Sequence, residues 1–116
     1  MSRNGTPVSD TQFKLRRWND VALVTIDNGE DWTKPTILGR AALESLAACL
    51  DAIEAQEWRA LVLTGKPFVF AAGADIAEFS LDPSAEKARA GSRAGHELFA
   101  RLAALPFPTV AAINGA

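Results

Sequence analysis

The apolar positions near the start of the chain follow a period of two. Residues 13–18, FKLRRW, alternate apolar and charged side chains, and residues 21–26, VALVTI, form an uncharged and largely β-branched run. Such runs predict β-strands, and the Asn19-Asp20 pair between them is typical of a two-residue hairpin turn. We therefore expect an antiparallel hairpin, followed by a loop over residues 27–36.

The period then changes to that of a helix. From about Leu38 onward, apolar side chains recur three or four positions apart, which predicts a helix with one buried stripe: Leu43, Leu46, Leu50 and Ile53. Residues 60–64, ALVLT, form a short uncharged segment closed by a glycine, which suits a strand buried on both faces. A helix-entry signal at residues 82–84 precedes a second helical stripe, and residues 109–113, TVAAI, predict a further buried strand.

The order of these elements is hairpin, helix, strand, helix, strand. That order is typical of an α/β fold in which helices cross over between parallel strands. The sequence ends at Asn114-Gly115-Ala116, directly after a strand, where α/β folds place their ligand sites. We expect residues 1–12 to be a disordered segment and residues 13–116 to be the N-terminal portion of a larger domain.

Composition excludes several classes of protein. The net charge is −2, from 12 basic and 14 acidic residues spread along the chain, which argues against nucleic acid as a partner. One cysteine and one histidine allow neither an internal disulfide nor a typical zinc site, so no metal is expected. No apolar stretch is long enough to span a membrane or to form a signal peptide. We expect a cytoplasmic protein with no membrane partner.

Small residues interrupt the apolar run just before a predicted helix. Residues 71–74 read AAGA, and Asp75 is a good N-cap for a short helix from Ile76 to about residue 80, with Glu78 completing a capping box. The backbone N–H groups at such a helix start are free, and small side chains leave them accessible to a ligand oxygen. The residues alone leave two interpretations open, an anion-binding backbone and a tight packing corner.

Two motifs resemble those of the enoyl-CoA hydratase (crotonase) family. Residues 70–76, FAAGADI, resemble the family's A-G-A-D-[IL] segment, and residues 108–115, PTVAAING, resemble its P-x-[IV]-A-x-[IV]-N-G strand. Residues 61–65, LVLTG, match the family strand before the first motif, so the resemblance covers residues 13–116. It implies a crotonase-like (ClpP/crotonase) spiral of ββα units, acyl-CoA thioester substrates, and homotrimers or hexamers. Coenzyme A would be part of the substrate, with no separate cofactor.

The resemblance also implies roles for individual residues. Ala74 matches the position whose backbone N–H is the first donor of an oxyanion hole. The residues that would border CoA, mainly with their main chain, are Ala72, Gly73, Ala74, Asp75, Ile76 and Ala77. The second donor and the two glutamates of hydratases would follow residue 116. Two departures stand out: Ala77 replaces a CoA-contacting lysine of many members, and residues 28–36 lack the N-x-x-x-N-A-[LM] pattern.

The activity implied is that of an enoyl-CoA hydratase (a lyase) or an enoyl-CoA isomerase of fatty acid β-oxidation. Two alternatives stay open: a non-catalytic CoA-binding or oligomerisation module, and the hydratase-like half of a protein that also carries a 3-hydroxyacyl-CoA dehydrogenase. Among other candidates, His96 is expected on a helix surface and Cys49 in the core. Asp75 is interpreted as a helix cap rather than a catalytic acid.

Overall fold

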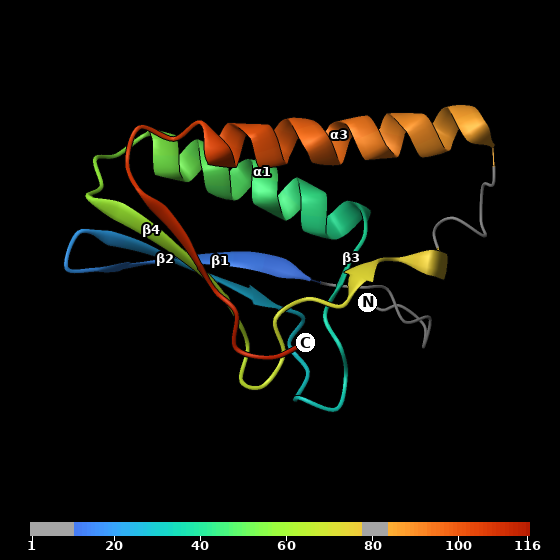
Figure 1. Ribbon diagram of the computed structural model, residues 1–116, viewed down its shortest axis with the longest axis horizontal. Coiled ribbons are helices and arrows are strands. Elements are labelled where there is room, and N and C mark those ends of the chain that lie inside the picture. Colours follow the sequence, from blue (N-terminus) through green and yellow to red (C-terminus); the bar gives the residue numbers. More distant parts are fainter. Residues whose placement is uncertain (1–10, 78–83) are drawn as a thin grey trace.

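The computed structural model describes residues 11–77 and 84–116. Its main sheet has the strand order β1-β2-β4-β6, and a smaller sheet pairs β3 with β5. Helices α1 (Arg40–Glu54) and α3 (Ala85–Ala103) lie side by side over one face of the main sheet (Figure 1). The strands are β1 (Gln12–Trp18), β2 (Val21–Asp27), β3 (Ile37–Leu38), β4 (Ala60–Gly65), β5 (Gly73–Ala74) and β6 (Thr109–Ala112).

The predicted hairpin is confirmed. Strands β1 and β2 pair antiparallel, and both turn residues, Asn19 and Asp20, have positive φ angles of 48° and 65°. Two such residues match the right-handed twist of the strands they join. Residues 1–10 of the predicted disordered segment lie outside the described residues. Thr11, however, is buried and Gln12 begins β1, so order starts before the expected boundary at residue 13.

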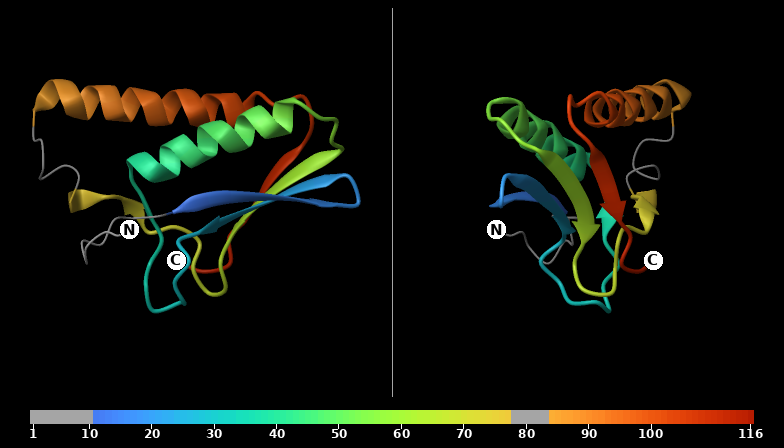
Figure 2. Two further views of the ribbon diagram at one scale, coloured as in Figure 1. Left: turned by 180° about the vertical axis from the view of Figure 1, so that it is seen from behind. Right: turned by 60° about the vertical axis from the view of Figure 1, so that its left-hand side comes forward.

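The predicted helical crossovers are also confirmed. Strand β4 pairs parallel to β2 and to β6, and α1 and α3 provide the two connections. Parallel strands end at the same edge of a sheet, so the loop after β2, the loop after β4 and the turn after β6 gather together (Figure 2). Within the described residues, no helix has the length and apolar character needed to cross a bilayer.

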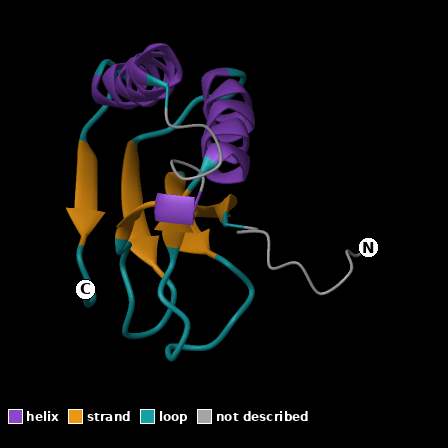
Figure 3. Ribbon diagram, turned by 90° about the vertical axis from the view of Figure 1, so that its right-hand side faces the viewer, coloured by secondary structure: helices purple, strands orange, loops and turns teal. Residues whose placement is uncertain are grey.

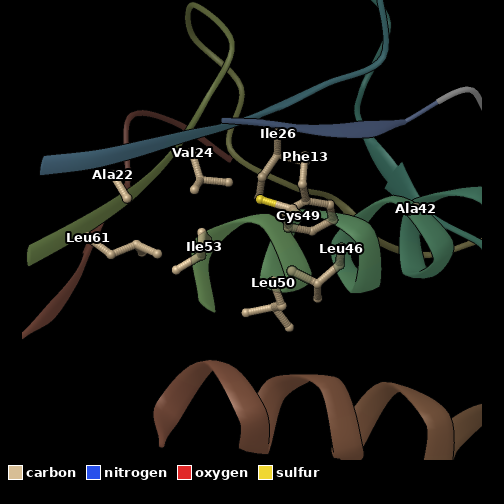
Figure 4. Close-up of a cluster of buried hydrophobic side chains, with 10 residues drawn as sticks. All are labelled: Phe13, Ala22, Val24, Ile26, Ala42, Leu46, Cys49, Leu50, Ile53 and Leu61. Carbon is tan, nitrogen blue, oxygen red and sulfur yellow. The ribbon is translucent and has the colours of Figure 1, made fainter. Parts of the chain in front are cut away.

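The core lies between α1 and the sheet. The predicted helical stripe supplies Leu46, Leu50 and Ile53, while Leu43 is half-buried. Figure 4 shows the buried cluster, which consists of Phe13, Ala22, Val24, Ile26, Ala42, Leu46, Cys49, Leu50, Ile53 and Leu61. The expectation that β4 is buried on both faces is wrong for the described chain. Both helices cover the same face (Figure 3), and residues Val62 and Thr64 on the other face are half-buried.

Helix α3 is less deeply buried than α1. Its N-cap is Ser84, whose side chain accepts a hydrogen bond from Lys87 N, as the entry signal predicts. None of its residues is fully buried. Near its end, Arg101 donates to Asp51 at 2.6 Å and to Glu54 at 2.8 Å, and its hydrogen bond lowers the pKa of Glu54. This ion-pair cluster joins α3 to α1.

Replacing Leu50 with alanine should destabilise the fold strongly. The Leu50 side chain is fully buried in the core cluster, and truncating such a leucine costs about 2–5 kcal/mol. Urea unfolding followed by circular dichroism measures the loss. Ala52→Ser on the exposed side of the same helix is the control and should change stability by less than about 0.5 kcal/mol. Equal effects of the two substitutions would contradict the packing described.

The thiol of Cys49 should be nearly inert in the folded protein. Burial raises its pKa to about 11, and only 6% of the residue is exposed. Because the thiolate is the reactive form, alkylation by iodoacetamide at pH 8 should be roughly a hundredfold or more slower than in the urea-unfolded chain. Equal rates in the two states would show that the cysteine is not in the core.

Candidate functional site

The backbone after β4 turns sharply and is tied to the end of β6. A side chain at Gly65 would come within 2.0 Å of the carbonyl oxygen of Val69, so only glycine fits. The amide side chain of Asn114 accepts from Gly65 N at 3.1 Å and donates to the carbonyl of Lys66 at 2.6 Å. Asn114 therefore fixes where the segment that follows β4 begins.

This segment then pairs with β3. Ala72 N donates to Thr36 O at 2.7 Å, and Asp75 N donates to Leu38 O at 3.2 Å. These bonds frame β5, in which Gly73 has a φ of +127°, a conformation that side-chain-bearing residues rarely adopt. Neither β3 nor β5 was predicted from the sequence, because two-residue strands show no apolar period.

We infer that the amide of Ala74 points away from β3. Asp75, the next residue, donates to β3, and successive amides of a strand point to opposite sides. The alternation does not extend back to Ala72, which also donates to β3, because the positive φ of Gly73 interrupts the regular strand between them. The other edge of β5 is open in the part of the chain that the structure describes, because the small sheet has only two strands. Residues 72–74 are exposed, and apart from the chain neighbours of Gly73 no atom of the described residues lies within 4 Å of a Cβ atom built there. Tight packing is therefore not what requires a glycine at residue 73, whereas Ala71 does pack against the core.

The residues after β5 begin a helix as expected. The carboxylate of Asp75 accepts a hydrogen bond from Ala77 N at 3.0 Å, which is the bond of an N-cap. The helix starts at Ile76, while Glu78 of the expected capping box lies outside the described residues. Ile76 is 76% exposed. The six predicted CoA-bordering residues thus form one continuous segment at the surface.

A buried lysine organises the neighbouring loop. Lys66 is only 3% exposed, and its Nζ donates to Asn28 Oδ1 at 2.6 Å. It also donates to three main-chain carbonyls, those of Glu30 (3.0 Å), Asp31 (2.8 Å) and Lys34 (2.5 Å). The burial of Lys66 could not be predicted from the sequence, because a single lysine directly after a strand carries no pattern that indicates burial.

Two carboxylates of the same region have lowered pKa values. A hydrogen bond from Gly29 N is the main cause at Asp27, and hydrogen bonds from the side chain and backbone of Thr33 are the main causes at Asp31. The positive charge of Lys66 contributes at both. Both carboxylates are therefore negatively charged at neutral pH and offset the buried ammonium.

The remaining candidates lie apart from this segment. His96 is exposed, as expected, in a hollow formed by α3 alone with Arg89, Ser92, Arg93 and Glu97. That hollow includes none of residues 72–77. Among residues 11–77 and 84–116, no three histidine, cysteine, aspartate or glutamate side chains are grouped so that they could hold a metal ion.

Solved structures with the same arrangement include two bacterial proteins. Pseudomonas aeruginosa DspI is 30% identical with a TM-score of 0.76, and the match covers 97% of this chain and 45% of that one. An enoyl-CoA hydratase from Bacillus anthracis is 26% identical with a TM-score of 0.75, covering 90% of this chain and 40% of that one.

Sequence relatives are longer than this chain. The fatty acid oxidation complex subunit alpha of Shewanella amazonensis is 44% identical over 108 residues, which are 90% of this chain and 15% of that protein. A probable enoyl-CoA hydratase of Bacillus subtilis is 35% identical over 97 residues, 83% of this chain and 36% of that protein. The family model described as enoyl-CoA hydratase/isomerase matches residues 17–116. The chain belongs to the enoyl-CoA hydratase/isomerase family and has the α/β crotonase fold, of which it spans less than half.

Proposed function

We propose that this chain is part of an acyl-CoA enzyme of fatty acid β-oxidation, with enoyl-CoA hydratase or isomerase activity. In this proposal the backbone N–H of Ala74 receives the carbonyl oxygen of the thioester. The observation that supports it most directly is the pair of hydrogen bonds from Ala72 and Asp75 to β3, from which we infer that the amide of Ala74, within the family's A-G-A-D-I segment, faces the edge of β5 that no described strand covers.

The chemistry explains why a fixed amide matters. Adding water to the 2,3 double bond of an enoyl thioester, or removing an α-proton from it, places negative charge on the carbonyl oxygen. A preorganised N–H donor stabilises that charge, and one such donor is worth about 2.7–4 kcal/mol in the transition state. The hydrogen bonds of Ala72 and Asp75 to β3 hold Ala74 in place from both sides.

The same segment would border coenzyme A. Most of residues 72–77 are exposed, and several have small side chains. Their main-chain groups would therefore be accessible to CoA. Ile76 adds an exposed apolar side chain against which the pantetheine arm could pack. At Ala77 this chain has no counterpart of the lysine found in many family members, so the CoA phosphates would be bound by other groups. No metal or further cofactor is part of the proposal.

The assembly of the whole protein is likewise a proposal. Exposed apolar side chains lie on α3, on β6 and directly after β6, namely Phe99, Val110 and Ile113. Such residues suit contacts with further parts of the protein or with other subunits. We propose a homotrimer or hexamer of the complete protein, as the family resemblance implies. The cytoplasmic location stays a prediction.

A second candidate function rests on the Shewanella relative. Its name describes a subunit of a fatty acid oxidation complex, and this chain matches only 15% of its length. The chain would then be the hydratase-like part of a larger β-oxidation protein with a dehydrogenase domain downstream. A glycine-rich dinucleotide motif in the rest of the gene would favour this candidate. Apolar residues at the family's two glutamate positions would instead favour a non-catalytic CoA-binding module.

The 116-residue chain alone should not hydrate crotonyl-CoA. It contains one proposed oxyanion donor, while the second donor and the catalytic carboxylates are expected in the sequence that follows. The loss of absorbance of crotonyl-CoA at the double bond measures turnover, with the complete gene product as positive control. Turnover by the isolated chain clearly above that of buffer would refute the assignment of the missing groups.

In the complete protein, Ala74→Pro should remove the proposed donor. The expected loss is about 10²–10³-fold in kcat, because proline has no N–H, whereas Ala74→Gly keeps the amide and serves as the matched control. Steady-state kinetics with crotonyl-CoA separates kcat from KM, and thermal unfolding checks that both variants fold. If the folded proline variant turns over like the glycine variant, Ala74 is not an oxyanion donor.

A further inference from the structure

The loop formed by residues 28–34 closes around a positive charge. Four oxygens face Lys66 Nζ at 2.5–3.0 Å, and three of them are main-chain carbonyls. An ammonium has three N–H groups, so two of these four oxygens must share one N–H. The arrangement is that of a small cation held by oxygen ligands, except that the cation is attached to the chain. We propose that the Lys66 ammonium is a positioning group for the proposed oxyanion strand β5.

Lys66 is part of a closed ring of contacts. From Lys66 the main chain runs to Ala72, whose amide bonds Thr36 O at 2.7 Å. From Thr36 the chain runs back through Pro35 to Lys34, whose carbonyl accepts from Lys66 Nζ. The side chain of Lys66 therefore links the segment that leads to β5 with the loop that leads to β3. A shift of β5 relative to β3 would therefore strain the hydrogen bond between Ala72 N and Thr36 O, which closes this ring.

The three carbonyls converge on the charge. They belong to exposed residues of a loop without regular secondary structure, and their shared partner, Lys66, is buried. Asp31 O also accepts from Lys34 N at 3.1 Å, so the loss of the ammonium would cost most at Glu30 O and would leave the negative ends of the three carbonyls facing one another. Polar groups that lose their partners are costly, so the loop would open to water instead. Asn28 would lose less, because its Nδ2 also donates to the carbonyls of Lys34 and Pro35.

Opening of this loop would displace β3, and a displacement of β3 would be passed on to the proposed site. The carbonyl of Leu38 holds Asp75 N, and Asp75 follows Ala74 directly. Misplacing a catalytic group by about 1 Å can cost about 10²-fold in rate. This consequence rests on the proposed function, whereas the effect of Lys66 on the position of β5 does not.

The experiment compares Lys66→Met with Glu30→Gln in the complete protein. Methionine keeps the length of the side chain without its charge. Glu30→Gln changes an exposed side chain of the same loop and leaves its carbonyl in place. Hydrogen exchange followed by mass spectrometry reports residues 29–34 together with the amides of Ala72 and Asp75. Lys66→Met should speed exchange in both regions by about tenfold or more, while Glu30→Gln should leave both unchanged.

Enzyme kinetics adds a second readout. If the proposed function holds, kcat/KM for crotonyl-CoA should fall about 10²-fold in Lys66→Met and stay unchanged in Glu30→Gln. Faster exchange in a protein that shows no hydratase or isomerase activity even when unaltered would support the positioning role and reject the proposed function. Unchanged exchange at Ala72 and Asp75 would overturn the positioning role, whatever the activity.

Chemical rescue tests the cation directly. Lys66→Ala should regain exchange protection in the presence of ethylammonium chloride, which carries N–H donors, but not with tetramethylammonium chloride, which has none. If the alanine variant folds and neither salt restores protection, the tethered-cation role is wrong. Should both Lys66 variants fail to fold, Asn28→Ala keeps the ammonium and three of its acceptors. It should raise exchange at residues 29–34 and Ala72 by a smaller factor, and no rise at either place would overturn the proposal.

Discussion

The geometry of the candidate site depends on the hydrogen bonds that the buried Lys66 ammonium donates to the loop after β2. The parallel strands β2, β4 and β6 end at one edge of the main sheet, and the loops there must satisfy their backbone polar groups without regular secondary structure. Lys66 does so for the loop after β2, and Asn114 does so between the ends of β4 and β6. Lys66, which directly follows β4, therefore connects the two segments that lead to β3 and β5.

Glycines in this region serve two different physical needs. Gly65 is required because the backbone at Val69 and Phe70 approaches too closely for any side chain. Gly73 has open space beside it and is required by its positive φ, which turns the chain into β5. Gly65 thus permits a close backbone approach, whereas Gly73 permits an unusual backbone conformation beside open space. Ala74 follows Gly73 directly, on a strand whose second edge has no partner among the described strands.

Much of the fold could be predicted from the sequence, because its elements are long enough to show a period. The hairpin, α1, α3 and the order of parallel strands follow from alternation, from the Leu46–Leu50–Ile53 stripe and from turn residues. The small sheet could not be predicted, since β3 and β5 have two residues each and depend on tertiary hydrogen bonds. The role of Lys66 depends on contacts with residues more than thirty positions away, which no local pattern records.

The central claim is that an acyl thioester carbonyl meets the amide of Ala74. The most direct measurement is a crystal structure of the complete protein with acetoacetyl-CoA, a thioester that can bind without turning over. The account predicts the thioester oxygen about 2.7–3.1 Å from Ala74 N, with the CoA running along residues 72–77. A bound thioester whose oxygen lies elsewhere, with Ala74 N bonded to another part of the protein, would contradict it.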